Sequence, residues 1–297
     1  MVPLHLSVIS SPPPLKPFVP TITAKCTSMA QQEPLLKFPH LSSSGEKLME
    51  GLLSTVESRL GPYLNPSFTP SDVRSFRNQN GSSQGSVNIR GGNNTRTMID
   101  FILGSWIHCK MPHGILNIFT LVGMLNTRTD TPHLLLEVIQ TGPSSLVLVL
   151  DLLPRKDLVL HSDYLKHYYE DAGLDPLRQQ LEKKPFSKPY ISSSLYIRSV
   201  VSPTAILFQI NSDSQMSMDE IVGGDVEPVV KQVVETWLRL CLEGTGRELE
   251  ESDRERILRR DNVIKTIGIE VDLLSNMPRL FGPDVTARVV DAFRKGV

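Results

Sequence analysis

Residues 98–152 read MIDFILGSWIHCKMPHGILNIFTLVGMLNTRTDTPHLLLEVIQTGPSSLVLVLDL, and this stretch decides the fold. Four runs rich in Ile, Leu, Val, Phe and Thr follow one another, and short Pro- and Gly-containing turns separate them. Runs of this composition are typical of strands, and turns this short join antiparallel neighbours. We therefore predict antiparallel strands at Met98–Cys109, Ile115–Leu125, His133–Gln140 and Leu146–Leu152, with turns at Pro112-His113-Gly114 and Gly142-Pro143.

Helical patterns flank this strand region on both sides. Ahead of it, Ser43-Ser44-Gly45-Glu46 fits a capping box, and apolar residues recur at helical spacing until Gly61-Pro62 ends the pattern. The polar stretch Asn65–Asn94 is expected to be a long loop with at most one strand, Ser86–Arg90. Beyond the strand region we predict helices at Tyr164–Leu181 (broken at Gly173), Glu227–Leu242, Arg247–Arg260 and Pro283–Lys295, and strands at Leu195–Val201, Ala205–Ile210 and Ile267–Leu274.

The order of these elements indicates the fold class. Strands come in a run and helices come before and after it, whereas a parallel sheet would need alternating βαβ units. We predict an α+β fold in which one antiparallel sheet is sandwiched between two α-helical layers. No internal repeat and no second linker after residue 45 are visible, which favours a single domain over residues 33–297.

Composition excludes several classes of protein. The chain has 297 residues, of which 40% are hydrophobic and 21% charged, as in soluble globular proteins. The formal net charge of −1 gives no basic field for nucleic acid, and no apolar stretch is long enough for a transmembrane helix. Cys26, Cys109 and Cys241 are too far apart in sequence for a zinc or iron–sulfur motif.

The first 32 residues have the properties of a targeting segment. They contain no Asp or Glu, many Ser and Thr, and a proline-rich stretch that prevents a regular helix. Mitochondrial presequences favour Arg, and Arg59 is the first arginine of this chain. We therefore predict that residues 1–32 are a chloroplast transit peptide, with a merely disordered N-terminus as the alternative and with dual targeting to mitochondria left open.

The common cofactor motifs are absent from the sequence. There is no P-loop, no GxSxG nucleophile elbow and no HExxH pattern. Gly244-Thr245-Gly246 follows a predicted helix and not a strand, so it does not fit a dinucleotide fingerprint. An enzyme built on this chain must work without these motifs.

Carboxylates inside apolar strands are the first candidates for chemistry. By alternation, Glu137 shares a strand face with Leu135 and Ile139. Burial would raise the pKa of such a carboxyl, so that it could hold and donate a proton near neutral pH. The alternative is a solvent-facing carboxylate or an ion pair with Arg. Comparable positions are predicted for Asp100, Asp151, Glu270 and Asp272.

Two further groups of residues each have a functional and a plainer interpretation. Trp106 and His108 fall on one face of their strand, where they could line a pocket for a planar ligand, or could form a core Trp beside a hydrogen-bonded His. Local basic residues could steer an acidic partner, or could simply be solvated. These basic residues are Arg155, Lys156, Arg178, Lys183, Lys184 and Lys188.

Several long segments resemble the red chlorophyll catabolite reductase family of plants, over about residues 38–295. The similar segments are Ile99–Lys110, Arg155–Leu160, Tyr164–Tyr169, Ser202–Ala205 and Pro278–Gly282. The resemblance implies reduction of red chlorophyll catabolite, an open tetrapyrrole, to a primary fluorescent chlorophyll catabolite. It also implies electrons from reduced ferredoxin, no bound flavin, metal or nicotinamide, a homodimer in the chloroplast stroma, and a fold similar to ferredoxin-dependent bilin reductases.

The resemblance also implies roles for individual residues. The two functional acids of the family map onto Glu137 and Asp272, and both would bind substrate and take part in catalysis. Val201 occupies the position that is linked in the family to which face of ring A receives the proton. The stretch Leu274-Ser275-Asn276 is less acidic than the family pattern, which leaves the edge of the pocket there less defined.

Three other functions remain open at this point. A bilin reductase acting on biliverdin would use a similar open tetrapyrrole. A non-catalytic carrier would sequester a phototoxic tetrapyrrole, and it would keep ligand binding when Glu137 and Asp272 are replaced by their amides. A scaffold for other chlorophyll-breakdown enzymes has no sequence feature in its favour.

Overall fold

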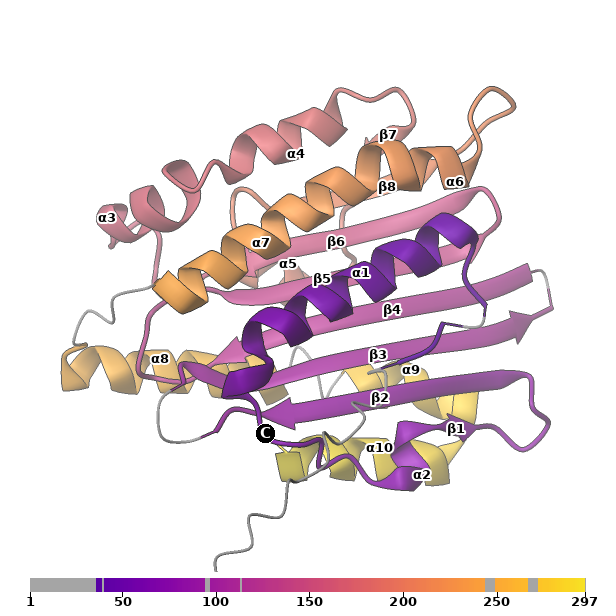
Figure 1. Ribbon diagram of the computed structural model, residues 1–297, viewed down its shortest axis with the longest axis horizontal. Helices are drawn as coiled ribbons and strands as arrows, with labels where there is room; N and C mark the ends of the chain where they lie inside the picture. The colour runs from indigo at the N-terminus through magenta and orange to yellow at the C-terminus, as the bar shows by residue number, and fades with distance from the viewer. Residues whose placement is uncertain are drawn as a thin grey trace, which may run out of the picture. The chain divides into compact units, whose positions relative to one another are not determined.

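The computed structural model describes residues 36–38, 40–93, 97–112, 114–243, 249–266 and 272–296. Its centre is an eight-stranded antiparallel sheet in the order β1-β2-β3-β4-β5-β6-β8-β7 (Figure 1). The strands are β1 (Phe76–Arg77), β2 (Ser83–Gly91), β3 (Ile99–Met111), β4 (Gly114–Leu125), β5 (His133–Gly142), β6 (Ser145–Leu153), β7 (Ser187–Pro189) and β8 (Ile206–Asn211). The four central hairpin strands and the α+β class are therefore confirmed.

One face of the sheet, here called the α7 face, is covered by the first helical layer (Figure 1). Leu134, Leu136 and Val138 of β5 point into this layer, and Trp237 is its largest fully buried side chain. Predicted helical periodicity is confirmed here, including the break at Gly173, whose φ of 68° is the left-handed conformation that glycine tolerates. The helices are α1 (Ser43–Leu60), α3 (Ser162–Leu165), α4 (Leu174–Glu182), α6 (Met218–Ile221) and α7 (Glu227–Glu243).

Close packing explains one glycine in the middle of a strand. Trp237 of α7 crosses β4 at Gly123, where a Cβ atom would lie 2.4 Å from the indole ring. Its indole N–H donates to the carbonyl of Pro132 at 3.1 Å, which satisfies the only polar group of this buried ring. Gly123 therefore lets α7 approach the sheet closely.

The opposite face, here called the α10 face, is covered by the second helical layer (Figure 1). Phe101 of β3 packs edge-on against Phe293 of α10, and Phe76 of β1 against Phe281 of α9. The predicted C-terminal helix is confirmed as α10. The helices around this face are α2 (Ser71–Arg74), α5 (Leu195–Val200), α8 (Glu251–Val263), α9 (Asp272–Phe281) and α10 (Pro283–Gly296). Two helical layers thus enclose the sheet, as predicted.

Three predicted elements are wrong or incomplete. The segment Leu195–Val201 is not a strand, because Ser194 caps it as the short helix α5 by accepting a bond from the Ile197 N–H at 3.3 Å. The loop predicted at Asn65–Asn94 contains α2, β1 and a strand longer than Ser86–Arg90, because β2 pairs with nine residues of β3. The predicted strand Ile267–Leu274 falls partly on residues 267–271, outside the described residues, and its last three residues begin helix α9.

Within the described residues, the structure has no helix that is both long enough and apolar enough to span a membrane.

Candidate active site

The α10 face of the sheet has a partly exposed region, here called the central strip. Strand alternation places Glu137 there, away from the core under α7, as predicted from its neighbours Leu135 and Ile139. At other positions on the same face, α9 and α10 bury the apolar side chains of β2 to β4. The strip consists of Ser105, Ile107, Ile118, Thr120, Glu137, Ile139, Val147 and Leu207, all of which are partly exposed.

Glu137 is the carboxylate of this strip. Its cross-strand neighbour on β4 is Thr120, whose hydroxyl donates to the Glu137 Oε1 at 3.3 Å. Its neighbour on β6 is the apolar Val149. A carboxyl that is flanked by apolar residues and still reachable from one side suits the binding of an N–H group or the delivery of a proton.

Val201 lies over the same face. It follows the last residue of α5, is partly buried, and packs against the same apolar cluster as Leu135 of β5. The next residue, Ser202, is anchored on the sheet by Asp151 of β6, since its N–H donates to Oδ2 at 2.7 Å and its hydroxyl donates to Oδ1 at 2.6 Å. Burial raises the pKa of Asp151 to about 6, although both bonds from Ser202 oppose the rise.

Asp272 is the first residue of helix α9, and its side chain lies outside the described residues. The following residue, Leu273, packs in the same cluster as Leu135 and Val201. The structure therefore brings Glu137, Val201 and the beginning of α9 to one face of the sheet.

Trp106 and His108 share a face, as predicted, but it is the opposite one. His40 stacks on His108 with ring centroids 3.8 Å apart and meets Trp106 edge-on at 6.1 Å. The buried imidazole Nδ1 is bonded to Asn117 Oδ1 at 2.7 Å. The structure does not bring these two residues to Glu137: Trp106 is partly exposed and packs against the core of the α7 face, and His108 is buried and hydrogen-bonded.

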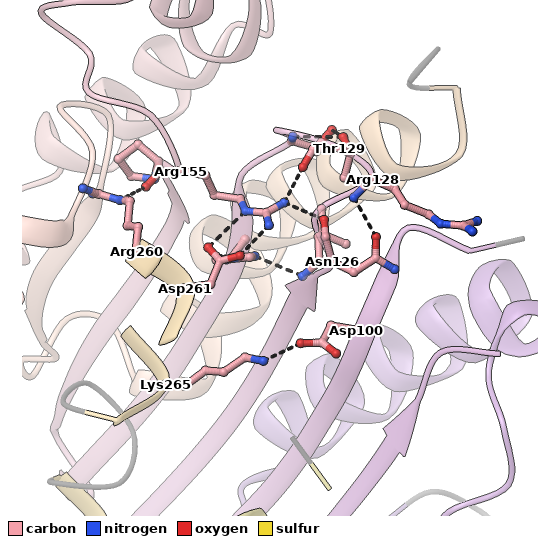
Figure 2. Close-up of polar contacts among 12 residues, drawn as sticks. Asp100, Asn126, Arg128, Thr129, Arg155, Arg260, Asp261 and Lys265 are labelled. Carbon is pink, nitrogen blue, oxygen red and sulfur yellow. Dashed lines mark hydrogen bonds and ion pairs between the residues drawn. The ribbon is translucent and has the colours of Figure 1, made fainter. Parts of the chain in front are cut away.

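Figure 2 shows a buried polar cluster where α8 meets the ends of β5 and β6. Arg155 is 2% exposed and donates hydrogen bonds to both carboxylate oxygens of Asp261. It also donates to the Thr129 carbonyl at 2.6 Å. His133 Nδ1 accepts from the Leu125 N–H at 3.0 Å, so its proton is on Nε2, which donates to Asp261 at 2.8 Å. Burial and the Arg155 charge lower the pKa of His133 to about 4.

This cluster corrects the interpretation of one basic residue. Arg155 is neither a steering charge nor a solvated one, because it is buried and its ion pair with Asp261 fixes α8 to the sheet. Lys156 pairs with Asp130 and Asp253. Asp100, which was grouped with the strand acids, pairs with Lys265 just beyond α8 (Figure 2). The ion pairs of the other basic residues are Arg178 with Asp175 and Glu182, and Lys184 with Asp225.

Sequence reasoning missed two features of the site. No sequence pattern indicates Thr120 as a site residue, because its contact with Glu137 depends on the register of β4 and β5. Asp151 was noted as an acid in an apolar strand, but its partner Ser202 lies 51 residues further on. A hollow of about 520 Å³ along α8 does not include Glu137 among its lining residues, and no cluster of metal-ligating residues occurs among those described. The candidate site is therefore the central strip of the sheet and not the hollow along α8.

Comparisons with known proteins identify the family of the chain. A family model described as red chlorophyll catabolite reductase matches residues 44–295. The chain is 44% identical over 263 residues, covering 88% of this chain and 82% of the relative, to the chloroplastic red chlorophyll catabolite reductase of Arabidopsis thaliana. It is 45% identical over 199 residues to that of Hordeum vulgare, covering 66% of this chain and 97% of the relative.

A solved structure shares the fold. Tomato phytochromobilin synthase, solved in complex with biliverdin, aligns with a TM-score of 0.63 and 16% identity over 84% of each chain. At that identity the likeness shows the fold alone. The family match covers most of the chain, and the relatives are well above 30% identical. The chain therefore belongs to the red chlorophyll catabolite reductase family, which is a family of oxidoreductases.

Proposed function

We propose that this protein reduces red chlorophyll catabolite to the primary fluorescent chlorophyll catabolite, with electrons from reduced ferredoxin. The observation that carries the proposal is the match to the family model over residues 44–295, and the position of Glu137 on a partly exposed strip of the sheet supports it. The reaction adds two electrons and two protons to the substrate, and two reduced ferredoxins become oxidised. A conjugated tetrapyrrole can hold the first electron as a delocalised radical, so the chain itself needs no bound flavin, metal or nicotinamide.

The residues of the strip have distinct tasks in this proposal. The apolar residues of the strip, such as Ile107, Ile118 and Ile139, supply a flat surface for the tetrapyrrole. Glu137 and Asp272 hold pyrrole N–H groups or deliver protons as each electron arrives. The methine bridge between rings D and A is the bond that is reduced, and Val201 restricts which face of ring A receives the proton.

The fold neighbour supports an open tetrapyrrole as ligand. Phytochromobilin synthase was solved with biliverdin, and this chain has the same fold. The family match favours red chlorophyll catabolite over biliverdin as the substrate. We further propose that the protein works as a homodimer in the chloroplast stroma after removal of residues 1–32, in keeping with the chloroplastic relatives.

An anaerobic assay tests the function. The protein is incubated with red chlorophyll catabolite, ferredoxin and a system that keeps ferredoxin reduced. We expect a blue-fluorescent product that requires ferredoxin. Tight binding without product would support the carrier instead, and turnover of biliverdin alone would support a bilin reductase.

Exchange of Val201 for Phe tests the stereochemical role. A larger side chain at the end of α5 would displace ring A, because Val201 already packs against the apolar cluster of the α10 face. We expect an altered ratio of the two product epimers, measured by chiral chromatography. An unchanged ratio would show that Val201 does not control the face of protonation.

A further inference from the structure

Asp151 is a buried acid on the face that carries the candidate site. It is 2% exposed, and it lies on β6 two residues beyond Val149, which is the cross-strand neighbour of Glu137. Side chains two residues apart on a strand point to the same face. A carboxylate buried at such a position is unfavourable unless hydrogen-bond donors compensate it.

The connection between α5 and β8 provides those donors. Ser202 uses its N–H and its hydroxyl on the two different carboxylate oxygens of Asp151, at 2.7 and 2.6 Å. The Ser202 hydroxyl oxygen also accepts from the Thr204 N–H at 3.1 Å. These three residues, here called the Asp151 clasp, tie a surface connection to the middle of the sheet.

Among the described residues, the helix that precedes this connection is loosely packed. Helix α5 has no buried residue, and Leu195 within it is 74% exposed. Ile191, just before the helix, is 72% exposed. Val201 lies between this loosely packed helix and the clasp, and it packs against the same apolar cluster as Leu135, the cross-strand neighbour of Asp151. The bonds of Ser202 to Asp151 therefore tie the backbone next to Val201 to the sheet.

We propose that Asp151 and Ser202 are positioning residues, whose paired hydrogen bonds fix Val201 against the substrate and so control which face of ring A is protonated. This inference rests on the proposed function. Neither residue has to touch the substrate, because both act through the backbone of Val201. The clasp selects the product epimer, and Glu137 remains the group that serves the reaction itself.

Three variants of the full protein test the clasp. Ser202→Ala removes the hydroxyl bond, Ser202→Thr keeps a hydroxyl in the same place, and Asp151→Asn keeps the shape but turns one acceptor into a donor. For Ser202→Ala and Asp151→Asn we expect the epimer ratio to shift by about fivefold or more, with kcat falling by less than about tenfold. Ser202→Thr should restore the wild-type ratio. If Ser202→Ala fails to fold, the epimer ratio of Asp151→Asn tests the positioning role alone.

A matched control separates positioning from stability. Thr69 is 3% exposed and makes a comparable buried bond to β2, where its hydroxyl oxygen accepts from the Ile89 N–H at 2.8 Å. Thr69→Val should lower the melting temperature without changing the epimer ratio. An unchanged ratio in both clasp variants, with wild-type protein active, would overturn this inference alone. A wild-type protein that forms no fluorescent product would overturn the proposed function first.

Discussion

Replacing Glu137 by Gln is expected to lower kcat by about 100- to 1,000-fold, with little change in affinity for red chlorophyll catabolite. General acid–base groups typically contribute factors of this size. Gln has the same shape, and its amide oxygen can still accept the bond from Thr120 that the carboxylate accepts at 3.3 Å. It cannot hold and release a proton. Anaerobic steady-state rates with ferredoxin, together with substrate binding followed by absorbance, measure the two effects separately.

Thr120→Val is the matched control for this experiment. It removes the hydroxyl beside Glu137 but leaves the carboxyl in place, and we expect a loss of less than about tenfold. Asp272→Asn tests the second proposed acid in the same assay. A Glu137→Gln protein with the wild-type rate would show that Glu137 is not the proton donor. If the wild-type protein shows no turnover and the Glu137→Gln and Asp272→Asn variants still bind red chlorophyll catabolite as the wild type does, the protein is a carrier.

The strands of the sheet could be predicted because their signal is local. Alternation and short turns marked β3 to β6, and they also placed Glu137 with Leu135 and Ile139 on one face. The segment at Leu195–Val201 failed because a short apolar run with β-branched residues fits a strand or a helix equally well. Its outcome was decided by the Ser194 cap.

The candidate site depends on pairings that no local pattern contains. Trp106 pairs with Phe119, whereas Glu137 pairs with the next residue of β4, Thr120. A difference of one residue in register reverses the face of a side chain, so Trp106 lies on the far side of the sheet from Glu137. The sequence alone could not supply that register. The contacts of Asp151 with Ser202 and of Arg155 with Asp261, across 51 and 106 residues, were invisible for the same reason.

Replacing Asp261 by Ala is expected to lower the free energy of unfolding by about 3–5 kcal/mol. Removal of one partner from a buried ion pair leaves the other charge without compensation. Arg155 is 2% exposed and bonds both oxygens of Asp261, and the His133 Nε2–H would lose its acceptor as well. Urea unfolding followed by circular dichroism at pH 7.5 measures the loss, since His133 is neutral in both states at that pH.

Asp253 is the matched control, because it is also an acid of α8 that pairs with basic residues. It contacts Lys156 at 3.2 Å and Arg256 at 3.3 Å at a partly exposed site, where ion pairs contribute about 0–1 kcal/mol. Asp253→Ala should therefore cost far less than Asp261→Ala. Equal small losses would mean that water compensates Arg155 and that the cluster does not fix α8. A large loss confined to Asp261 would make this cluster the main anchor of α8, the helix that precedes α9 and its first residue, Asp272.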